Sequence, residues 1–311
     1  MTSSPIRIAT RKSPLAITQA EIIKSELLKL YPELNVQLIP LSTTGDKLLG
    51  APLAQIGGKG LFVKELEQAL LENRADLAVH SMKDVPVNIT EGLEITTICE
   101  REDPRDAFIT NQYSDFSTLP EGARIGTASM RRGCQIKARR PDIQIEILRG
   151  NVNTRLQKLD DGQYDAIILA AAGLKRLGLE NRISHYLTID ESLPAVGQGA
   201  IGIECRSDDY LLKEKLAALD HSYTRLCVEA ERSMNHALNG GCQVPIAAYA
   251  EIINNSSIYL RGLVARTDGS KLLTAHASSD LNSAEQLGKQ VAKDLIHQGA
   301  DKILKEIYST P

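Results

Sequence analysis

The stretch Ile6-Arg7-Ile8-Ala9-Thr10 decides how the first part of the chain is interpreted, because it predicts a strand that leads into a helix. Apolar residues recur at helical spacing from Leu15 to Leu30. A second strand is expected at residues 36–41, a helix at 61–73 and a buried strand at 76–80. Short strands that alternate with helices are typical of an α/β fold with a largely parallel sheet.

The same order of segments recurs about a hundred residues later. The matched pairs are residues 7–10 with 124–127, 36–41 with 143–148, and 75–79 with 164–168. The recurrence predicts two related α/β lobes with a cleft between them, although apolar strands also align by chance. Ligands of open α/β sheets bind beyond the carboxyl ends of the strands, so the loops after these strands are where we expect the chemistry.

Residues from about 218 onward have a different pattern. A helix precedes Cys242, and two alternating runs follow at 246–253 and 257–264. An amphipathic helix is expected at 284–296. This part of the chain therefore predicts a small α+β domain, and the length of 311 residues is consistent with two or three domains.

Composition excludes several classes of protein. Aromatic residues make up 4% of the chain and Trp is absent, which argues against a protein that stacks nucleobases. The formal net charge is -3, so any anion site must come from local basic residues. The five cysteines include no C-x-x-C pair, which argues against disulfides and a zinc site. We expect no metal, and without a signal peptide or a long apolar run we expect a cytoplasmic protein.

The glycine-rich segment from Thr43 to Gly60 has little periodicity. It is interpreted either as a mobile lid over the cleft or as a plain surface loop.

Basic residues follow the predicted strands in both lobes. They are Arg11, Lys12, Lys83, Arg131, Arg132, Arg149, Arg155, Lys175 and Arg176. Ser13, Ser129 and Thr154 lie where helices are expected to start, and helix starts offer free N–H groups to anions. Because arginine binds carboxylates in a bidentate manner, the set predicts a site for a small ligand with several negative charges. Solvated helix faces remain the alternative for any single arginine.

Two further residues could carry chemistry. Asp84 follows a strand within a basic run, where its carboxylate could act as a general base, stabilise a developing cation or pair with Lys83. Cys242 follows Gly240 and Gly241, which leave its sulfur open to approach, whereas the other cysteines lie in apolar or helical contexts. From spacing alone Cys242 is a weak candidate for a nucleophile.

Motifs spread over nearly the whole chain resemble those of the hydroxymethylbilane synthase, or porphobilinogen deaminase, family. They lie at residues 7–16 (RIATRKSPLA), 78–86 (AVHSMKDVP), 126–132 (GTASMRR), 148–155 (LRGNVNTR), 194–199 (PAVGQG) and 238–242 (LNGGC). Together these motifs are highly specific, and none departs from the family pattern.

The resemblance implies two lobes similar to periplasmic binding proteins and a small α+β C-terminal domain. The first lobe would comprise residues 1–99 with 200–217, the second 100–199, and the third domain 218–311. A monomer is expected, with no nucleic-acid or membrane partner.

The resemblance also implies a transferase of haem and other tetrapyrrole biosynthesis. Such an enzyme deaminates four porphobilinogen molecules and couples them head to tail on a covalent dipyrromethane cofactor, and water then releases hydroxymethylbilane. Each pyrrole carries an acetate and a propionate, so the growing chain is a polyanion that many arginines would suit.

The matched positions imply roles for individual residues. Asp84 would be the catalytic carboxylate and Cys242 the thioether attachment of the cofactor. The other cofactor-binding residues would be Ser81, Lys83, Thr127, Ser129, Arg131, Arg132, Asn151 and Arg155. The substrate-binding residues would be Arg11, Ser13, Gln19, Arg149, Arg176 and Gln198.

Other functions fit parts of the same pattern. A solute-binding protein or the sensor domain of a regulator would also have two lobes around an anion site. The first is disfavoured by the lack of a signal peptide and the second by the lack of a helix-turn-helix. An acyl-transfer enzyme that uses Cys242 would need a partner base, and none is apparent.

Overall fold

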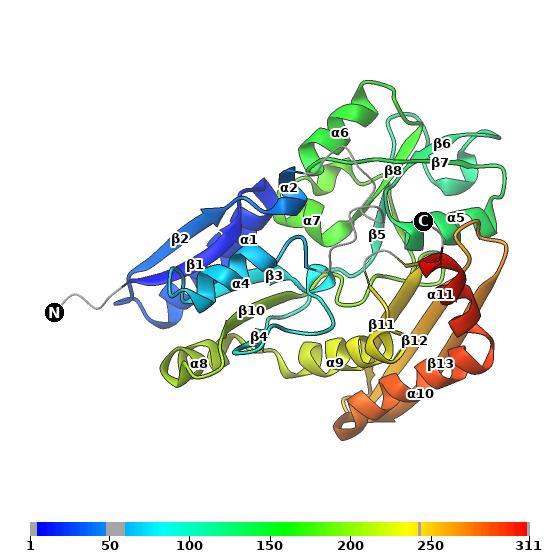
Figure 1. The fold of residues 1–311 in the computed structure, drawn as a ribbon. Coiled ribbons are helices and arrows are strands. Elements are labelled where there is room, and N and C mark those ends of the chain that lie inside the picture. Colours follow the sequence, from blue (N-terminus) through cyan, green and yellow to red (C-terminus); the bar gives the residue numbers. More distant parts are fainter. Residues whose placement is uncertain (1–4, 48–59, 242–243, 310–311) are drawn as a thin grey trace.

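The computed structural model describes residues 5–47, 60–241 and 244–309. In these ranges the strands form two five-stranded sheets and one three-stranded sheet. Figure 1 shows the two larger sheets in separate lobes, with the small sheet and its helices beside both. The chain is therefore an α/β protein with two lobes and a small C-terminal domain, as the sequence predicts.

The first large sheet and its helices form lobe 1. Across the sheet its strands are β2 (Val36–Leu41), β1 (Ile6–Arg11), β3 (Leu77–Ser81), β10 (Ile201–Arg206) and β4 (Leu93–Ile98). Its helices are α1 (Pro14–Leu30), α2 (Thr44–Lys47), α4 (Lys64–Leu71) and α8 (Tyr210–Leu216), followed by the 3-10 turn η4 (Ala217–Leu219). β10 returns to this sheet antiparallel to β3 and β4, after the chain has passed through the other lobe.

The second large sheet and its helices form lobe 2. Across the sheet its strands are β7 (Gln144–Glu146), β6 (Arg124–Gly126), β8 (Ala166–Ala170), β5 (Asp106–Ile109) and β9 (His185–Leu187). Its helices are α5 (Met130–Arg139), α6 (Val152–Asp160) and α7 (Ala171–Arg176), with 3-10 turns η2 (Phe116–Thr118) and η3 (Glu180–Arg182).

The predicted repeat is confirmed by the sheet orders. In both lobes the strand that comes first in the repeat lies between its two parallel partners, and an antiparallel strand follows. A contact at the start of this strand is repeated as well. The backbone N–H of Arg7 donates to the Asp76 carboxylate (2.8 Å), and that of Arg124 donates to Asp165 (2.7 Å).

The start of α1 shows why these residues form a helix. Ser13 caps the helix by accepting from the N–H of Ala16 (3.4 Å), and Pro14 occupies the first turn, where its missing N–H costs nothing. Ile23 and Leu27, one turn apart, are buried against the sheet. The apolar periodicity that predicted the helix is therefore the face that packs in the core.

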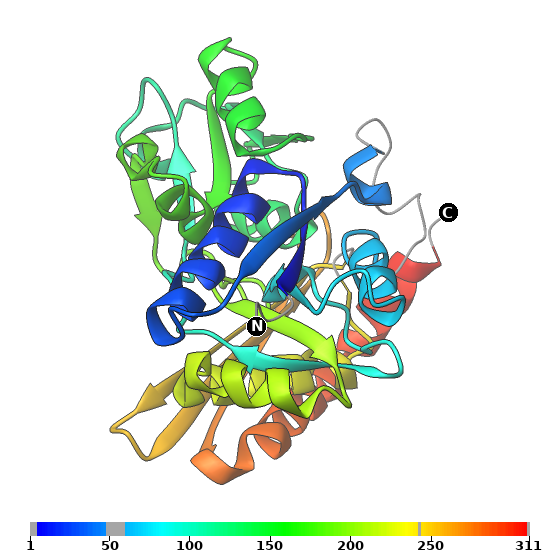
Figure 2. The same cartoon turned by 90° about the vertical axis from the view of Figure 1, so that its left-hand side faces the viewer.

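The C-terminal domain is a meander of β11 (Ile246–Ile253), β12 (Ser257–Ala265) and β13 (Leu272–Asp280). Helices α9 (Ser222–Ala237) and α10 (Ala284–His297) pack together on this sheet, with α11 (Ala300–Tyr308) and the turn η5 (Leu281–Ser283) beside them. Figure 2 shows this domain below both lobes. Glu231 of α9 accepts hydrogen bonds from Arg101 and from the N–H of Gly197, so this helix reaches the segments that connect the lobes.

Candidate active site

The turn η1 (Met82–Asp84) directly follows β3 and carries Lys83 and Asp84. Met82 is buried and its backbone N–H donates to the carbonyl of Ala200 (3.0 Å). Gly197 has φ +69°, and a Cβ there would lie 2.8 Å from the Cβ of Met82. Only glycine allows the connecting segment to approach this closely, so the packing fixes the turn that bears Lys83 and Asp84.

Helix α9 of the C-terminal domain holds the chain just after Asp84. The Arg232 guanidinium donates to the carbonyls of Val85 (3.2 Å), Pro86 (2.7 Å) and Val87 (3.3 Å). Burial lowers the pKa of Arg232. The C-terminal domain thereby restrains the loop that carries the catalytic candidate.

In lobe 2 the loop after β6 places arginines in the first turn of α5. Ser129 caps this helix by accepting from the N–H of Arg132 (3.4 Å), and Thr127 accepts from the N–H of Ser129 (3.2 Å). Arg131 and Arg132 are both buried, with 4% and 7% of their surface exposed. Guanidinium groups are seldom buried without anionic partners, so their surroundings need a carboxylate.

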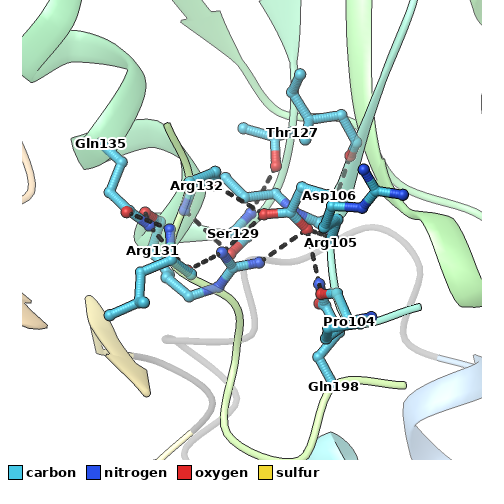
Figure 3. Close-up of polar contacts among 12 residues, drawn as sticks. Pro104, Arg105, Asp106, Thr127, Ser129, Arg131, Arg132, Gln135 and Gln198 are labelled. Atoms are coloured by element: carbon cyan, nitrogen blue, oxygen red, sulfur yellow. Dashed lines mark hydrogen bonds and ion pairs between the residues drawn. The ribbon is translucent and has the colours of Figure 1, made fainter. Parts of the chain in front are cut away.

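That carboxylate is Asp106, at the start of β5 (Figure 3). It accepts from Arg131 Nη1 (2.8 Å) and Nη2 (3.2 Å) and from Arg132 Nε (3.0 Å) and Nη2 (2.7 Å). Ser192 Oγ (2.8 Å) and Gln198 Nε2 (3.0 Å) also donate to it. Asp106 is fully buried, and six donors surround its two oxygens.

Charges from the two lobes act on one another here. Burial alone would raise the pKa of Asp106, but the charges of Arg131 and Arg132 hold it well below its ordinary range. Burial lowers the pKa of Lys83 to about 8; Asp84 opposes this shift and Arg132 adds to it. The turn of lobe 1 and the arginines of lobe 2 therefore belong to one electrostatic cluster.

The start of α6 adds Arg155 to this cluster. Burial and the charge of Arg132 lower the pKa of Arg155 to about 10, and Asp84 opposes the shift. Its Nε donates to the carbonyl of Gly150 (2.7 Å). Asn151 caps α6, and its Oδ1 accepts from the N–H of Thr154 (2.9 Å). The oxygen of the exposed Asn151 side chain is thus already used by the helix.

Models of known protein families match most of this chain. Residues 6–214 match the porphobilinogen deaminase, dipyromethane cofactor binding domain, and residues 225–297 match the porphobilinogen deaminase C-terminal domain.

The chain belongs to the porphobilinogen deaminase family.

Membership of the porphobilinogen deaminase family gives the reaction and the cofactor. The protein is a transferase of tetrapyrrole biosynthesis with hydroxymethylbilane synthase function. It deaminates and couples porphobilinogen on a dipyrromethane cofactor, the group for which its first matched domain is named.

Several solved structures similar to this porphobilinogen deaminase family member are solute-binding proteins. A putative methionine-binding lipoprotein of Bacillus subtilis is 12% identical, with 69% of this chain and 89% of that one covered and a TM-score of 0.43. The aliphatic sulphonate binding protein SsuA of Escherichia coli is 14% identical (76% and 71% covered, TM-score 0.41). A substrate-binding protein of a Coxiella burnetii ABC transporter is 13% identical (69% and 91% covered, TM-score 0.43).

The substrate-binding candidates of lobe 1 differ in burial, since the side chain of Arg11 is partly exposed and Gln19 is buried. Arg11 forms an ion pair with Asp46, and its guanidinium lies over the Phe62 ring, 4.2 Å from the centroid. Gln19 Nε2 donates to Ser81 Oγ (2.9 Å), which joins a substrate candidate to a cofactor candidate. Arg11 is thus held by a partly exposed carboxylate and Gln19 by a neutral hydroxyl.

The remaining substrate-binding candidates differ in position. Arg149 lies near Arg155 and contributes to lowering its pKa. Arg176 ends α7, and its Nη2 donates to the carbonyl of Gly199 (2.6 Å). Gln198 is 1% exposed, and its amide nitrogen is occupied by Pro104 and Asp106. Gln198 therefore lies behind Asp106, unlike the partly exposed Arg149.

Cys242 and the segment 48–59, which includes most of the predicted lid, lie outside the described residues. The thiols of Cys99, Cys134, Cys205 and Cys227 lie within them, and burial raises the pKa of each to about 12. Because the thiolate is the reactive form, these four are poor nucleophiles at neutral pH.

Sequence reasoning did not identify Asp106 or Arg232. Asp106 ends the charged run 101–106 and begins a buried strand, and an acid at such a place needs a cationic partner. That pattern could have predicted a buried ion pair, although not its partners. Arg232 lies on an amphipathic helix among other charged residues, and nothing in its spacing distinguishes it.

Among the residues that the structure describes, no three His, Cys, Asp or Glu side chains are placed to hold a metal ion. No helix in the described ranges is long and apolar enough to cross a membrane.

Proposed function

We propose that Asp84 is the catalytic carboxylate of hydroxymethylbilane synthesis, and that the buried cations of lobe 2 hold the carboxylates of the dipyrromethane. The observation that carries this proposal is the single cluster formed by Lys83 and Asp84 of lobe 1 with Arg132 and Arg155 of lobe 2. A cluster in which bases outnumber acids, with Asp84 on the turn after β3, suits a cationic reaction within a polyanionic ligand.

The residues present fit a dipyrromethane. Lys83, Arg131, Arg132 and Arg155 outnumber the two acids in the same cluster, Asp84 and Asp106, so the excess positive charge suits carboxylates. The pKa values of Lys83 and Arg155 are lowered by burial, and a bound carboxylate would relieve that cost. Ser81, Thr127, Ser129 and Asn151 would add neutral donors. When bound, the dipyrromethane supplies the primer to which pyrroles are added.

Asp84 would serve the chemistry of the incoming substrate. When ammonia leaves the aminomethyl carbon of porphobilinogen, positive charge develops on the pyrrole, and a nearby carboxylate stabilises it. The same oxygen can accept the proton that is lost at the coupling carbon. Arg232 would support both steps by restraining the loop after Asp84.

The substrate would be oriented by side chains at the edge of this cluster. We assign this role to Arg11, Ser13, Gln19, Arg149, Arg176 and Gln198. Arg11 and Arg149 could take substrate carboxylates directly, whereas the buried Gln198 would act through Asp106.

The attachment of the cofactor is assigned to Cys242. The raised pKa values of the other four cysteines favour Cys242 by exclusion. We also propose domain limits of 1–99 with 200–217, 100–199 and 218–311. β10 in the first sheet supports the return of the chain to lobe 1.

We further propose that the protein is a cytoplasmic, monomeric hydroxymethylbilane synthase that acts on porphobilinogen without a nucleic-acid partner. The low aromatic content and the net charge of -3 support the last point.

Asp84→Ala tests the catalytic assignment. The variant should keep the covalent cofactor and bind porphobilinogen, while turnover falls by about 10²- to 10⁴-fold because the general acid–base group is lost. Turnover and denatured mass are measured on the same sample. Turnover close to that of the unmodified protein would remove Asp84 from the role.

Cys242→Ser tests the attachment, with Cys99→Ser as the matched control. The first variant should lack the covalent mass of two pyrroles, and the second should retain it. A normal cofactor mass on Cys242→Ser would show that another group holds the dipyrromethane.

A further inference from the structure

We propose that Asp106 is a positioning residue, which orients the Arg131 and Arg132 guanidiniums together for the carboxylates of the dipyrromethane. The proposal rests on the cofactor-binding role proposed above for these two arginines. It assigns to one buried carboxylate the preorganisation of the site in lobe 2.

The hydrogen bonds to Asp106 fix both guanidinium planes. Arg132 presents Nε and Nη2 to Oδ1 (3.0 and 2.7 Å), and Arg131 presents Nη1 to Oδ2 (2.8 Å) and Nη2 to Oδ1 (3.2 Å). A planar guanidinium with two N–H groups on one carboxylate cannot rotate without breaking a bond. Backbone carbonyls complete the hold, since Arg131 Nη1 donates to Leu193 (2.7 Å) and Arg132 Nη1 to Ile168 (3.1 Å).

These partners accept from only some of the N–H groups of each guanidinium. Each has five N–H groups, and among the described acceptors Asp106 and the carbonyls take only three from each. The remaining donors of Arg131 and Arg132 belong to side chains with 4% and 7% of their surface exposed. Buried donors of fixed direction are what a bound carboxylate needs.

Lobe 1 shows that the fold itself does not require this carboxylate. In lobe 2 Asp106 pairs with Ala170, the last residue of β8, and in lobe 1 Ile201 pairs with Ser81, the last residue of β3. β3 and β8 hold the same position in the two sheets, so Ile201 is the counterpart of Asp106.

The partners of Asp106 differ between the lobes in the same way. Counted from the capping serines, Leu15 and Ala16 hold the places in α1 that Arg131 and Arg132 hold in α5. Acid and bases are thus present together in lobe 2 and replaced together by apolar residues in lobe 1. The carboxylate is present where the arginines are present and absent where they are absent, although the sheet order is the same in both lobes. This favours a role for Asp106 in the site.

Asp106 also limits repulsion among the buried cations. It raises the pKa of Lys83, whereas Arg131 and Arg132 lower it. Removing the charge of Asp106 should therefore make Lys83 lose its proton at lower pH. This provides a readout that a merely structural role would not change.

Asp106→Asn is the direct test, because it keeps the shape and removes the charge. Apo protein is loaded with preformed hydroxymethylbilane over a range of pH, and the covalent cofactor is quantified by mass under denaturing conditions. We expect loading to fall by about tenfold or more, with its upper pH limit moved to lower pH. Loading equal to that of the unmodified protein at every pH would overturn the proposal.

Two matched controls separate the charge at this site from general effects. Ser192→Ala removes a neutral donor to the same carboxylate, and Asp103→Asn removes a charge from the same segment, where Asp103 binds Arg105 instead. Both should load as the unmodified protein does. Equal losses in all three variants would mean that this segment is merely sensitive to substitution, which also overturns the proposal.

Asp106→Glu provides the test if Asp106→Asn does not fold. It keeps the charge and shifts the carboxylate by one methylene, so loading should slow while its pH dependence stays unchanged. Normal loading by this variant would contradict a positioning role.

Arg131→Gln and Arg132→Gln distinguish this proposal from the one on which it rests. If both load normally, the cofactor-binding role of the arginines fails, and the role of Asp106 fails with it. If both load poorly while Asp106→Asn loads normally, only the positioning role is wrong.

Discussion

At the end of β6 the arginines of lobe 2 are buried around Asp106, whereas at the equivalent end of β1 the side chain of Arg11 is 23% exposed and pairs with Asp46. The two lobes have the same sheet order, so this difference comes from side chains rather than from topology.

The difference suggests a division of labour between a permanent and a passing ligand. Buried donors that are already oriented lose little freedom on binding, which suits a cofactor that stays through every cycle. A partly exposed pair is weak and exchanges readily, which suits a substrate that must enter and move on. The comparison therefore favours Arg131 and Arg132 of lobe 2 as contacts of the cofactor and Arg11 of lobe 1 as an exchangeable contact of the substrate.

The largest effect is expected when lobe 2 is given the apolar residues of lobe 1. The triple variant Arg131→Leu, Arg132→Ala and Asp106→Ile should fold but carry no covalent cofactor. Asp106→Ala alone leaves two buried cations without their partner and should lose about 3–5 kcal/mol in free energy of unfolding, more than the triple variant loses. For both variants, denaturant unfolding measures the free energy of unfolding, and the mass under denaturing conditions measures the covalent cofactor. Equal destabilisation in the two variants would contradict the comparison.

A smaller effect is expected from pH through Lys83. Its pKa in the folded protein is lowered from 10.5 to about 8 by burial, so above pH 8 the folded chain releases a proton that the unfolded chain still holds. The free energy of unfolding of the apo protein should therefore rise with pH between about 8 and 10.5. Cofactor loading should fall over the same range, because the ammonium that we propose to bind carboxylates is lost.

Lys83→Met serves as the reference for this pH effect, and Lys158→Met on α6 as the control. Lys83→Met should make both the free energy of unfolding and cofactor loading less dependent on pH. Lys158→Met should leave both dependences unchanged. Parallel curves for all three proteins would show that Lys83 does not titrate in this range.

The smallest effect is expected in lobe 1. Asp46→Asn removes the ionic partner of Arg11, whose exposed pair contributes about 1 kcal/mol or less, and should lower the KM for porphobilinogen by up to about fivefold. Cofactor mass should not change. Asp142→Asn, which removes the partner of Arg140 at the surface of lobe 2, is the control and should leave the KM unchanged. A loss of covalent cofactor in Asp46→Asn would place Arg11 in the cofactor site instead.

Much of the fold could be predicted from local pattern. Residues 36–41 and 246–253 form strands with the predicted limits, and α1 differs from its prediction by one residue. These segments pack on one face, so apolar spacing alone reveals them. β13 was missed because residues 272–280 include polar side chains on both faces, and its strand state comes from pairing with β12.

The site could be predicted only in part. Strand ends and helix starts identified the positions of Lys83, Arg131 and Arg132, because these follow from local sequence. Asp106 lies 25 residues from Arg131 and binds it across the sheet, and such a contact depends on strand order. A single sequence does not encode that order in any local pattern, so tertiary partners remained hidden.

The mass of the purified chain under denaturing conditions, before and after porphobilinogen is added, tests the central claim most directly. The account predicts a covalent excess of two pyrrole units that grows in single pyrrole steps with substrate. A chain of unmodified mass both before and after addition, even when preformed hydroxymethylbilane is supplied, would contradict an anchored cofactor and the roles built on it.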